Sequence, residues 1–126
     1  MQKRESERGA VAVEFALILP ILVALLLGIM EFGRAYHTQI TLTSAAREGA
    51  RTMAVLNEAP AARQAARAAA VGLAPGVADG QIAISPPACT PGGTVSVVIT
   101  YDLASMTGFF GPGWQLTGRA AMRCGG

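Results

Sequence analysis

The pattern of hydrophobic and polar positions begins with an apolar run at residues 10–30, in which Glu14 and Pro20 are the only exceptions to Ala, Val, Leu, Ile, Phe, Met and Gly. At about 1.5 Å of rise per residue, a helix of this length spans roughly 30 Å, the thickness of the hydrocarbon core of a bilayer. We therefore expect residues 10–30 to form a transmembrane helix.

A helical pattern continues beyond this run. Residues 31–56 contain no proline, and small or apolar residues recur there at a spacing of three to four. These residues are Ile40, Ala45, Ala46, Gly49, Ala50 and Met53, whereas Arg47, Glu48 and Arg51 occupy the remaining surface. The pattern predicts one helix from about residue 10 to residue 56, of which residues 31–56 are an amphipathic, extramembrane continuation. Threonines and a serine in residues 38–44 lower helix propensity, so we expect fraying there.

Residues 57–126 have the pattern of a small α+β domain. Asn57 and Pro60 suit the start of a short helix at about residues 60–73, and Gly72 and Pro75 suit its end. The period then changes to two at residues 81–85, 94–101 and 115–123. One face of the middle segment carries Val95, Val97, Ile99 and Tyr101. We expect a three-stranded antiparallel sheet whose apolar face packs on the second half of the long helix.

The connection at residues 103–113 is unusual because it is apolar. It holds Met106, Phe109 and Phe110 among glycines, and Trp114 follows. Such a loop either folds onto the core or forms a contact surface for a partner. We favour the core, because a small domain has few apolar groups to bury.

Charge bears mainly on the orientation of the chain. The formal net charge is +2, and no basic cluster exists beyond Lys3, Arg4 and Arg8, so the composition does not favour nucleic acid as a partner. These three residues precede the apolar run, and the more basic flank of a first helix usually stays in the cytoplasm. We expect a single-pass membrane protein with a cytoplasmic N-terminus and an extracytoplasmic C-terminal domain.

The two cysteines, Cys89 and Cys124, both lie in this C-terminal domain. If the domain is exported, an even number of cysteines permits one disulfide, which would join the chain end to a loop. Two reduced and unrelated thiols are the alternative.

The chain shows no pattern typical of an enzyme. Its single histidine, His37, has no second metal ligand at a suitable spacing, and the cysteines do not form a CxxC motif. No glycine-rich nucleotide loop and no set of nucleophile, base and oxyanion donor is present. We therefore expect no enzymatic activity, no metal and no cofactor. Arg63 and Arg67 are four residues apart and could bind an anion, but a solvated helix face is the simpler interpretation.

Glu14 is the residue that the apolar run explains least. An ionised carboxylate in hydrocarbon costs several kcal/mol unless it is paired. If the chain is cut between Gly9 and Ala10, the new α-amino group lies about one helical turn from the Glu14 carboxylate. Pro20 lies within the same helix, where it lacks an N–H, so a kink or a loosened turn is expected.

Two other interpretations of the N-terminal region remain. A cleavable signal peptide has an apolar core of about 7–15 residues and a small-residue site behind it. Here the run is longer, Glu14 interrupts it, and Glu31-Phe32-Gly33-Arg34 follows. A plain signal anchor with an incidental Glu14 is the second alternative.

The string Gly9, Ala10-Val11-Ala12-Val13, Glu14-Phe15 resembles the processing site of type IV prepilins of the tight-adherence (Tad/Flp) class. The resemblance extends through the block at residues 44–51 to Arg51 and is to the TadE-like family of pseudopilins. It implies a prepilin leader at residues 1–9, cleavage after Gly9 by a prepilin peptidase, and a pilin-like fold with a helix laid across a small sheet. It also implies a role for Phe15 in packing the helix neck or in recognition by the peptidase.

The same resemblance implies a minor structural component of a tight-adherence pilus and secretion system. The major Flp pilin is much shorter and has no large globular part, whereas this chain has a domain beyond residue 56. The implied partners are other Tad pilins and pseudopilins and the inner-membrane Tad assembly platform, and the protein could enter a surface pilus. The alternative function is an uncleaved, membrane-anchored extracytoplasmic binding domain.

Overall fold

A computed structural model describes residues 2–125 of the chain, with side chains from Arg4 onward. Helix α1 (Gln2–Leu56) is the first element, and its residues belong to two compact units. The first unit ends at Gly33 and the second begins at Arg34. Each unit is described by itself below.

In the first unit, α1 begins at Gln2, eight residues before the expected start at Ala10. The residues ahead of the apolar run include good helix formers such as Arg4 and Glu7, and Glu5 in the first turn complements the positive end of the helix dipole. The helix continues through Pro20 without an interruption.

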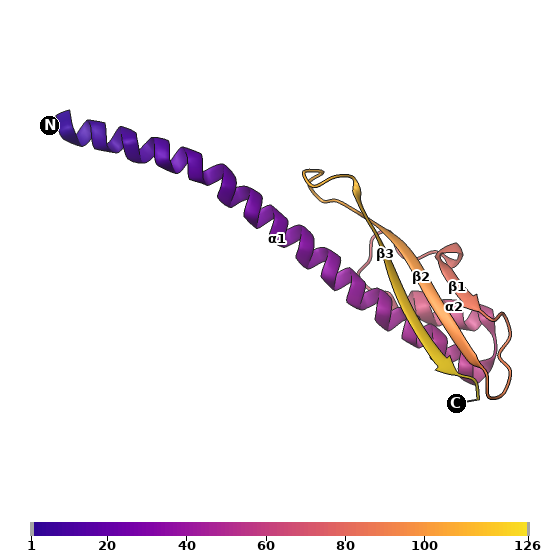
Figure 1. The fold of residues 1–126 in the computed structure, drawn as a ribbon. Coiled ribbons are helices and arrows are strands. Elements are labelled where there is room, and N and C mark those ends of the chain that lie inside the picture. Colours follow the sequence, from indigo (N-terminus) through magenta and orange to yellow (C-terminus); the bar gives the residue numbers. More distant parts are fainter. Residues whose placement is uncertain (1, 126) are drawn as a thin grey trace. The chain divides into compact units, whose positions relative to one another are not determined.

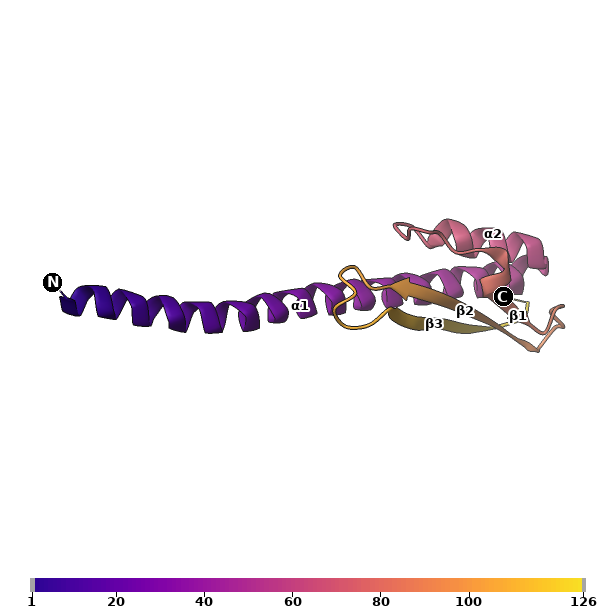
Figure 2. The same cartoon turned by 90° about the horizontal axis from the view of Figure 1, so that it is seen from above.

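The second unit has the expected α+β fold (Figure 1). After the second half of α1 come α2 (Ala59–Ala69), a short 3-10 helix (Asp79–Gln81), β1 (Ile82–Ser85), β2 (Thr94–Ala104) and β3 (Gly113–Arg123). The strands form one antiparallel sheet in the order β1-β2-β3. Strands β2 and β3 run alongside the second half of α1, and α2 also lies against that helix (Figure 2).

The inner face of the sheet is the one that the alternating pattern predicted. Val95, Val97 and Ile99 are fully buried, and Tyr101 is 3% exposed. Their partners on α1 include the small residues Ala45, Ala46 and Ala50, which are also fully buried. Ile40, which the helical spacing grouped with them, is instead 50% exposed, so its predicted place in the core is wrong.

Gly118 allows the sheet to approach α1 closely. It lies on β3 opposite Ile99 and is buried. A Cβ atom at this position would lie 2.5 Å from the carbonyl carbon and oxygen of Leu42, which are backbone atoms of the helix. Only a residue without a side chain fits between the two elements here.

The threonine-rich turns of α1 are helical throughout. The hydroxyls of Thr41 and Thr43 donate to the carbonyl oxygens of His37 and Gln39, at 3.0 and 2.9 Å. Gln39 Nε2 also donates to the carbonyl of Thr117 on β3 at 2.8 Å. Packing against the sheet and the hydrogen bond from Gln39 to β3 outweigh the weak helix propensity of the segment.

Helix α2 ends at Ala69, four residues before the predicted end at residue 73. The backbone N–H of Ala70 donates to the carbonyls of Ala66 and Arg67, and Gly72 has a positive φ of 81° that takes the chain out of the helix. Arg67 Nε forms an ion pair with Asp79 Oδ1 at 3.0 Å. Both side chains are largely exposed, so the pair adds little to stability.

The prediction that the β2–β3 connection folds onto the core is wrong for Met106, Phe109 and Phe110. Met106, Phe109 and Phe110 are 56%, 67% and 44% exposed. Strands β2 and β3 each extend further than predicted and form a long two-stranded hairpin, which carries this loop beyond the residues that the core can cover. Trp114, already on β3, does pack against the core.

Candidate processing and assembly site

The residues of the candidate cleavage site lie within α1 of the first unit. Gly9 and Ala10 are helical and exposed. A Cβ atom added at Gly9 would have nothing within 4 Å, apart from the helix's own backbone. A side chain at this position therefore meets no steric obstacle from the fold, so a variant of Gly9 reports on an incoming enzyme.

Glu14 follows Ala10 by four positions on the same helix, which puts the two residues on one face about one turn apart. Glu14 is exposed, and among the residues whose side chains the structure describes, none forms an ion pair with it. Phe15, on the adjacent position, is 62% exposed. The geometry lets an amine formed at Ala10 reach the Glu14 carboxylate within a subunit or lets either group reach a neighbouring chain.

After Ala10, residues 11–30 are apolar on all faces of the helix, with Glu14 as the charged exception. Large exposed side chains of this part of α1 include Val11, Val13, Leu17, Ile18, Ile21, Leu25, Leu26 and Ile29. A helix that is hydrophobic around its whole circumference is stable only inside lipid or among other apolar helices. The helix is also long and apolar enough to cross a membrane, judged by length and composition. These properties are consistent with a single-pass membrane protein.

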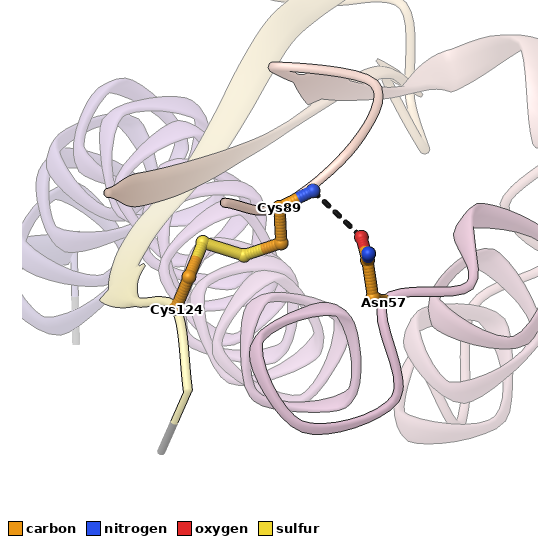
Figure 3. The surroundings of a disulfide bond; sticks show 3 residues. All are labelled: Asn57, Cys89 and Cys124. Carbon is orange, nitrogen blue, oxygen red and sulfur yellow. Dashed lines mark hydrogen bonds between the residues drawn. A yellow bond between two sulfur atoms is a disulfide. The ribbon is translucent and has the colours of Figure 1, made fainter. Parts of the chain in front are cut away.

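The second unit contains the disulfide Cys89–Cys124 (Figure 3). Its Cα atoms lie 5.7 Å apart, and it joins the β1–β2 loop to the residue after β3. Asn57, which ends α1 with a positive φ of 53°, accepts a hydrogen bond from the Cys89 N–H through its Oδ1 at 2.6 Å. Cys124 is 8% exposed and packs with Met53, Ala54, Ala62 and Val95. The disulfide therefore holds the chain end and a loop against the far end of α1.

Several structurally important residues were missed by the sequence analysis. Asn57 was predicted only to suit the start of α2, and Arg34 was given no structural role. In the structure Arg34 Nη1 donates to the carbonyl of Ala104 at 2.6 Å. No pattern in the sequence indicates that long-range contact. Gly118 was detectable in principle, because an isolated glycine within a strand indicates a bulge or a close approach of backbone. Within residues 2–125, no group of three His, Cys, Asp or Glu residues is placed to hold a metal ion.

Comparison with known proteins finds a family model that matches about a third of the chain. The family model described as TadE-like protein matches residues 9–51, from Gly9 through the apolar run to Arg51. The match confirms the TadE-like resemblance, and α2 and the sheet lie outside it. This family implies a pilin-like structural component associated with Tad pili and with other proteins of those pili. No curated protein and no solved structure matches the chain.

Proposed function

We propose that the protein is a minor, pilin-like pseudopilin of a tight-adherence type IV pilus and secretion system, matured by a prepilin peptidase that cuts between Gly9 and Ala10. Residues 1–9 are the leader, residues 10–30 cross the inner membrane, and residues 57–126 with the helix at 31–56 form the extramembrane part. The observation that carries the proposal is Glu14, an exposed carboxylate in an apolar helix, one turn beyond a Gly-Ala bond at the start of the TadE-like match.

Two further features support a cytoplasmic N-terminus and an extracytoplasmic second unit. Disulfides persist in oxidising compartments, so Cys89–Cys124 favours an extracytoplasmic position for the second unit. The basic residues Lys3, Arg4 and Arg8 favour a cytoplasmic N-terminus. The proposed partners are therefore the peptidase at the leader, other Tad pilins along the helix, and the inner-membrane assembly platform.

The proposed mechanism is electrostatic. Cleavage creates an ammonium group at Ala10, which neutralises the Glu14 carboxylate of the same subunit or of a neighbour. Pairing between neighbours aligns the helices axially, because a shift by one turn separates the charges in a medium where separation is costly. Since burying the pair also carries a desolvation penalty, its main effect is on the register of packed helices.

The mature N-terminus tests the cleavage step. In cells that contain the peptidase, we expect intact-mass analysis of the membrane-extracted protein to give a chain that starts at Ala10. Gly9→Leu should leave the full precursor in the membrane, because the new side chain obstructs the enzyme and no part of the fold. Gly33→Leu is the matched control, since Gly33 is also helical and a Cβ there has nothing within 4 Å beyond the helix itself. A wild-type chain that starts at Met1 in those cells would favour the uncleaved, membrane-anchored binding domain.

Glu14→Gln tests the pairing step. The change keeps the size of the side chain and removes its charge. Close desolvated charge pairs couple by about 1.5–7 kcal/mol, so we expect at least a roughly tenfold loss of assembled pili. Glu14→Asp, which keeps a carboxylate, should retain more assembly than Glu14→Gln. The measurement is the yield of sheared pili, with cleavage followed in parallel; wild-type yields from Glu14→Gln would remove the pairing mechanism.

A further inference from the structure

The tip of the β2–β3 hairpin is an exposed apolar surface without charge. Residues 105–112 contain no acidic or basic side chain. Met106, Phe109 and Phe110 are all exposed, and the two phenyl rings pack edge to face with centroids 5.2 Å apart. Exposed apolar side chains that gather in this way mark a binding surface for another protein or for a membrane.

The tip is a formed turn. The N–H of Ser105 donates to the carbonyl of Pro112 at 3.3 Å, and the N–H of Gly108 donates to Ser105 Oγ at 3.0 Å. The N–H of Phe109 donates to Thr107 Oγ1 at 3.2 Å. Because these bonds satisfy backbone donors inside the turn, the apolar side chains can enter a less polar medium at a reduced desolvation cost.

The register of the second unit shows where this tip lies. Val95, at the start of β2, packs near Met53 of α1. Further along, Ile99 is paired with Gly118, which contacts Leu42. At the end of β2 the carbonyl of Ala104 accepts the hydrogen bond from Arg34. Strand β2 thus runs back along α1 toward lower residue numbers, and residues 105–112 follow at the Arg34 end of the unit.

That end of the unit is also where the chain leaves the apolar run. Arg34 is only four positions beyond Met30, the last residue of the run, in the sequence. Tyr36, two positions beyond Arg34 on α1, is 72% exposed. Aromatic side chains are enriched at the level of the lipid headgroups, and the long side chain of Arg can keep its charge in water at the same level.

We propose that the hairpin tip, residues 105–112, inserts together with Tyr36 into the interfacial layer of the membrane that residues 10–30 cross. The occupant of this apolar surface is the lipid bilayer, because the tip carries no charge for a charged partner and lies at the end of the unit that adjoins the membrane segment. The proposal rests on the membrane anchoring in the proposed function. Its consequence is a second attachment of the extramembrane unit to the bilayer.

A tryptophan placed at the tip tests the insertion. The full chain carries Phe109→Trp with Trp114→Phe, so that the new tryptophan is the only one. Val55→Trp with Trp114→Phe is the matched control, because Val55 is 65% exposed, similar to Phe109 at 67%, and lies toward the opposite end of the unit. Each protein is reconstituted into phosphatidylcholine–phosphatidylglycerol vesicles, with and without bromine atoms on the acyl chains close to the headgroups.

We expect a blue-shifted emission and a marked loss of intensity in brominated vesicles for Phe109→Trp, and no loss for Val55→Trp. If both variants show equal emission without bromine quenching, and both chains resist alkaline extraction from the vesicles, this proposal is overturned. The membrane anchoring is then still supported. A second outcome also overturns the proposal. If the tryptophan at the tip is protected from acrylamide quenching only when many chains share a vesicle, and bromine does not quench it, the occupant is a second copy of the chain. Release of the chain at alkaline pH contradicts the anchoring itself, and this proposal with it.

Discussion

We expect Gly118→Val to lower the free energy of unfolding of the second unit by about 3 kcal/mol or more, at or above the upper end of the usual range for overpacked cores. The new Cβ would lie 2.5 Å from the backbone carbonyl of Leu42 and 2.8 Å from its Cβ atom. Helix backbone cannot rotate aside as a side chain does. The sheet and α1 must therefore separate, which opens the contacts of Leu42, Ala45 and Ala46 with the inner face of the sheet.

The measurement is urea unfolding of the full chain in detergent, followed by the fluorescence of Trp114, the single tryptophan, which packs against the core. Ala121→Val is the matched control, since Ala121 is on the same strand and exposed. Valine suits a strand position with space around it, so the control should unfold at the wild-type midpoint or above it. A wild-type midpoint for Gly118→Val would show that the helix and the sheet do not approach as closely as described.

The second large effect concerns the disulfide. We expect Cys89→Ser with Cys124→Ser to destabilise the second unit by about 4 kcal/mol, because the bond closes a loop of 35 residues in the unfolded chain. The folded state should change little. The N–H of Cys124 donates to the carbonyl of Gly93 at 2.8 Å, and the N–H of Gly125 to that of Ala54 at 3.1 Å. Neither backbone bond involves a sulfur atom.

Two comparisons make this result specific. Wild-type protein treated with a reductant should unfold at the same urea concentration as the double serine variant. Ala88→Ser, an exposed substitution beside the bridge, should leave the midpoint unchanged. If reduction does not move the wild-type midpoint, the loop between the cysteines is restrained by other contacts, and the calculated effect is wrong.

The sequence predicted the parts of the fold that depend on periodicity. Alternation placed Val97 and Ile99 on the inner face of the sheet, and the recurrence of small residues placed Ala46 and Ala50 opposite them. Both signals arise because one face of each element must leave water. The predicted end of α2 was less accurate, because the sequence does not distinguish the turn that Ala70 forms from a further turn of helix.

Contacts between segments far apart in the chain were not predictable in the same way. The hydrogen bond from Arg34 to Ala104 spans 70 positions, and it depends on the register of β2 along α1. The exposed state of Phe109 and Phe110 depends on the extra length of the two strands. For the candidate site, Glu14 was identified as a carboxylate within the apolar run, and cleavage between Gly9 and Ala10 is what the TadE-like resemblance implies. The roles of these residues remain predictions for the experiments above.

The two outer strands of the sheet bear on how such subunits polymerise. Strand β1 has only four residues and runs directly into Pro86 and Pro87, which cannot donate backbone hydrogen bonds. At the other edge, on β3, the side chain of Gln39 donates a hydrogen bond to the carbonyl of Thr117. The exposed Arg119 and Arg123 of β3 repel a second copy of the same strand. Growth by edge-to-edge strand addition, the route to amyloid, is thereby disfavoured. The exposed apolar side chains of α1 offer a surface through which an ordered fibre can be joined without strand addition.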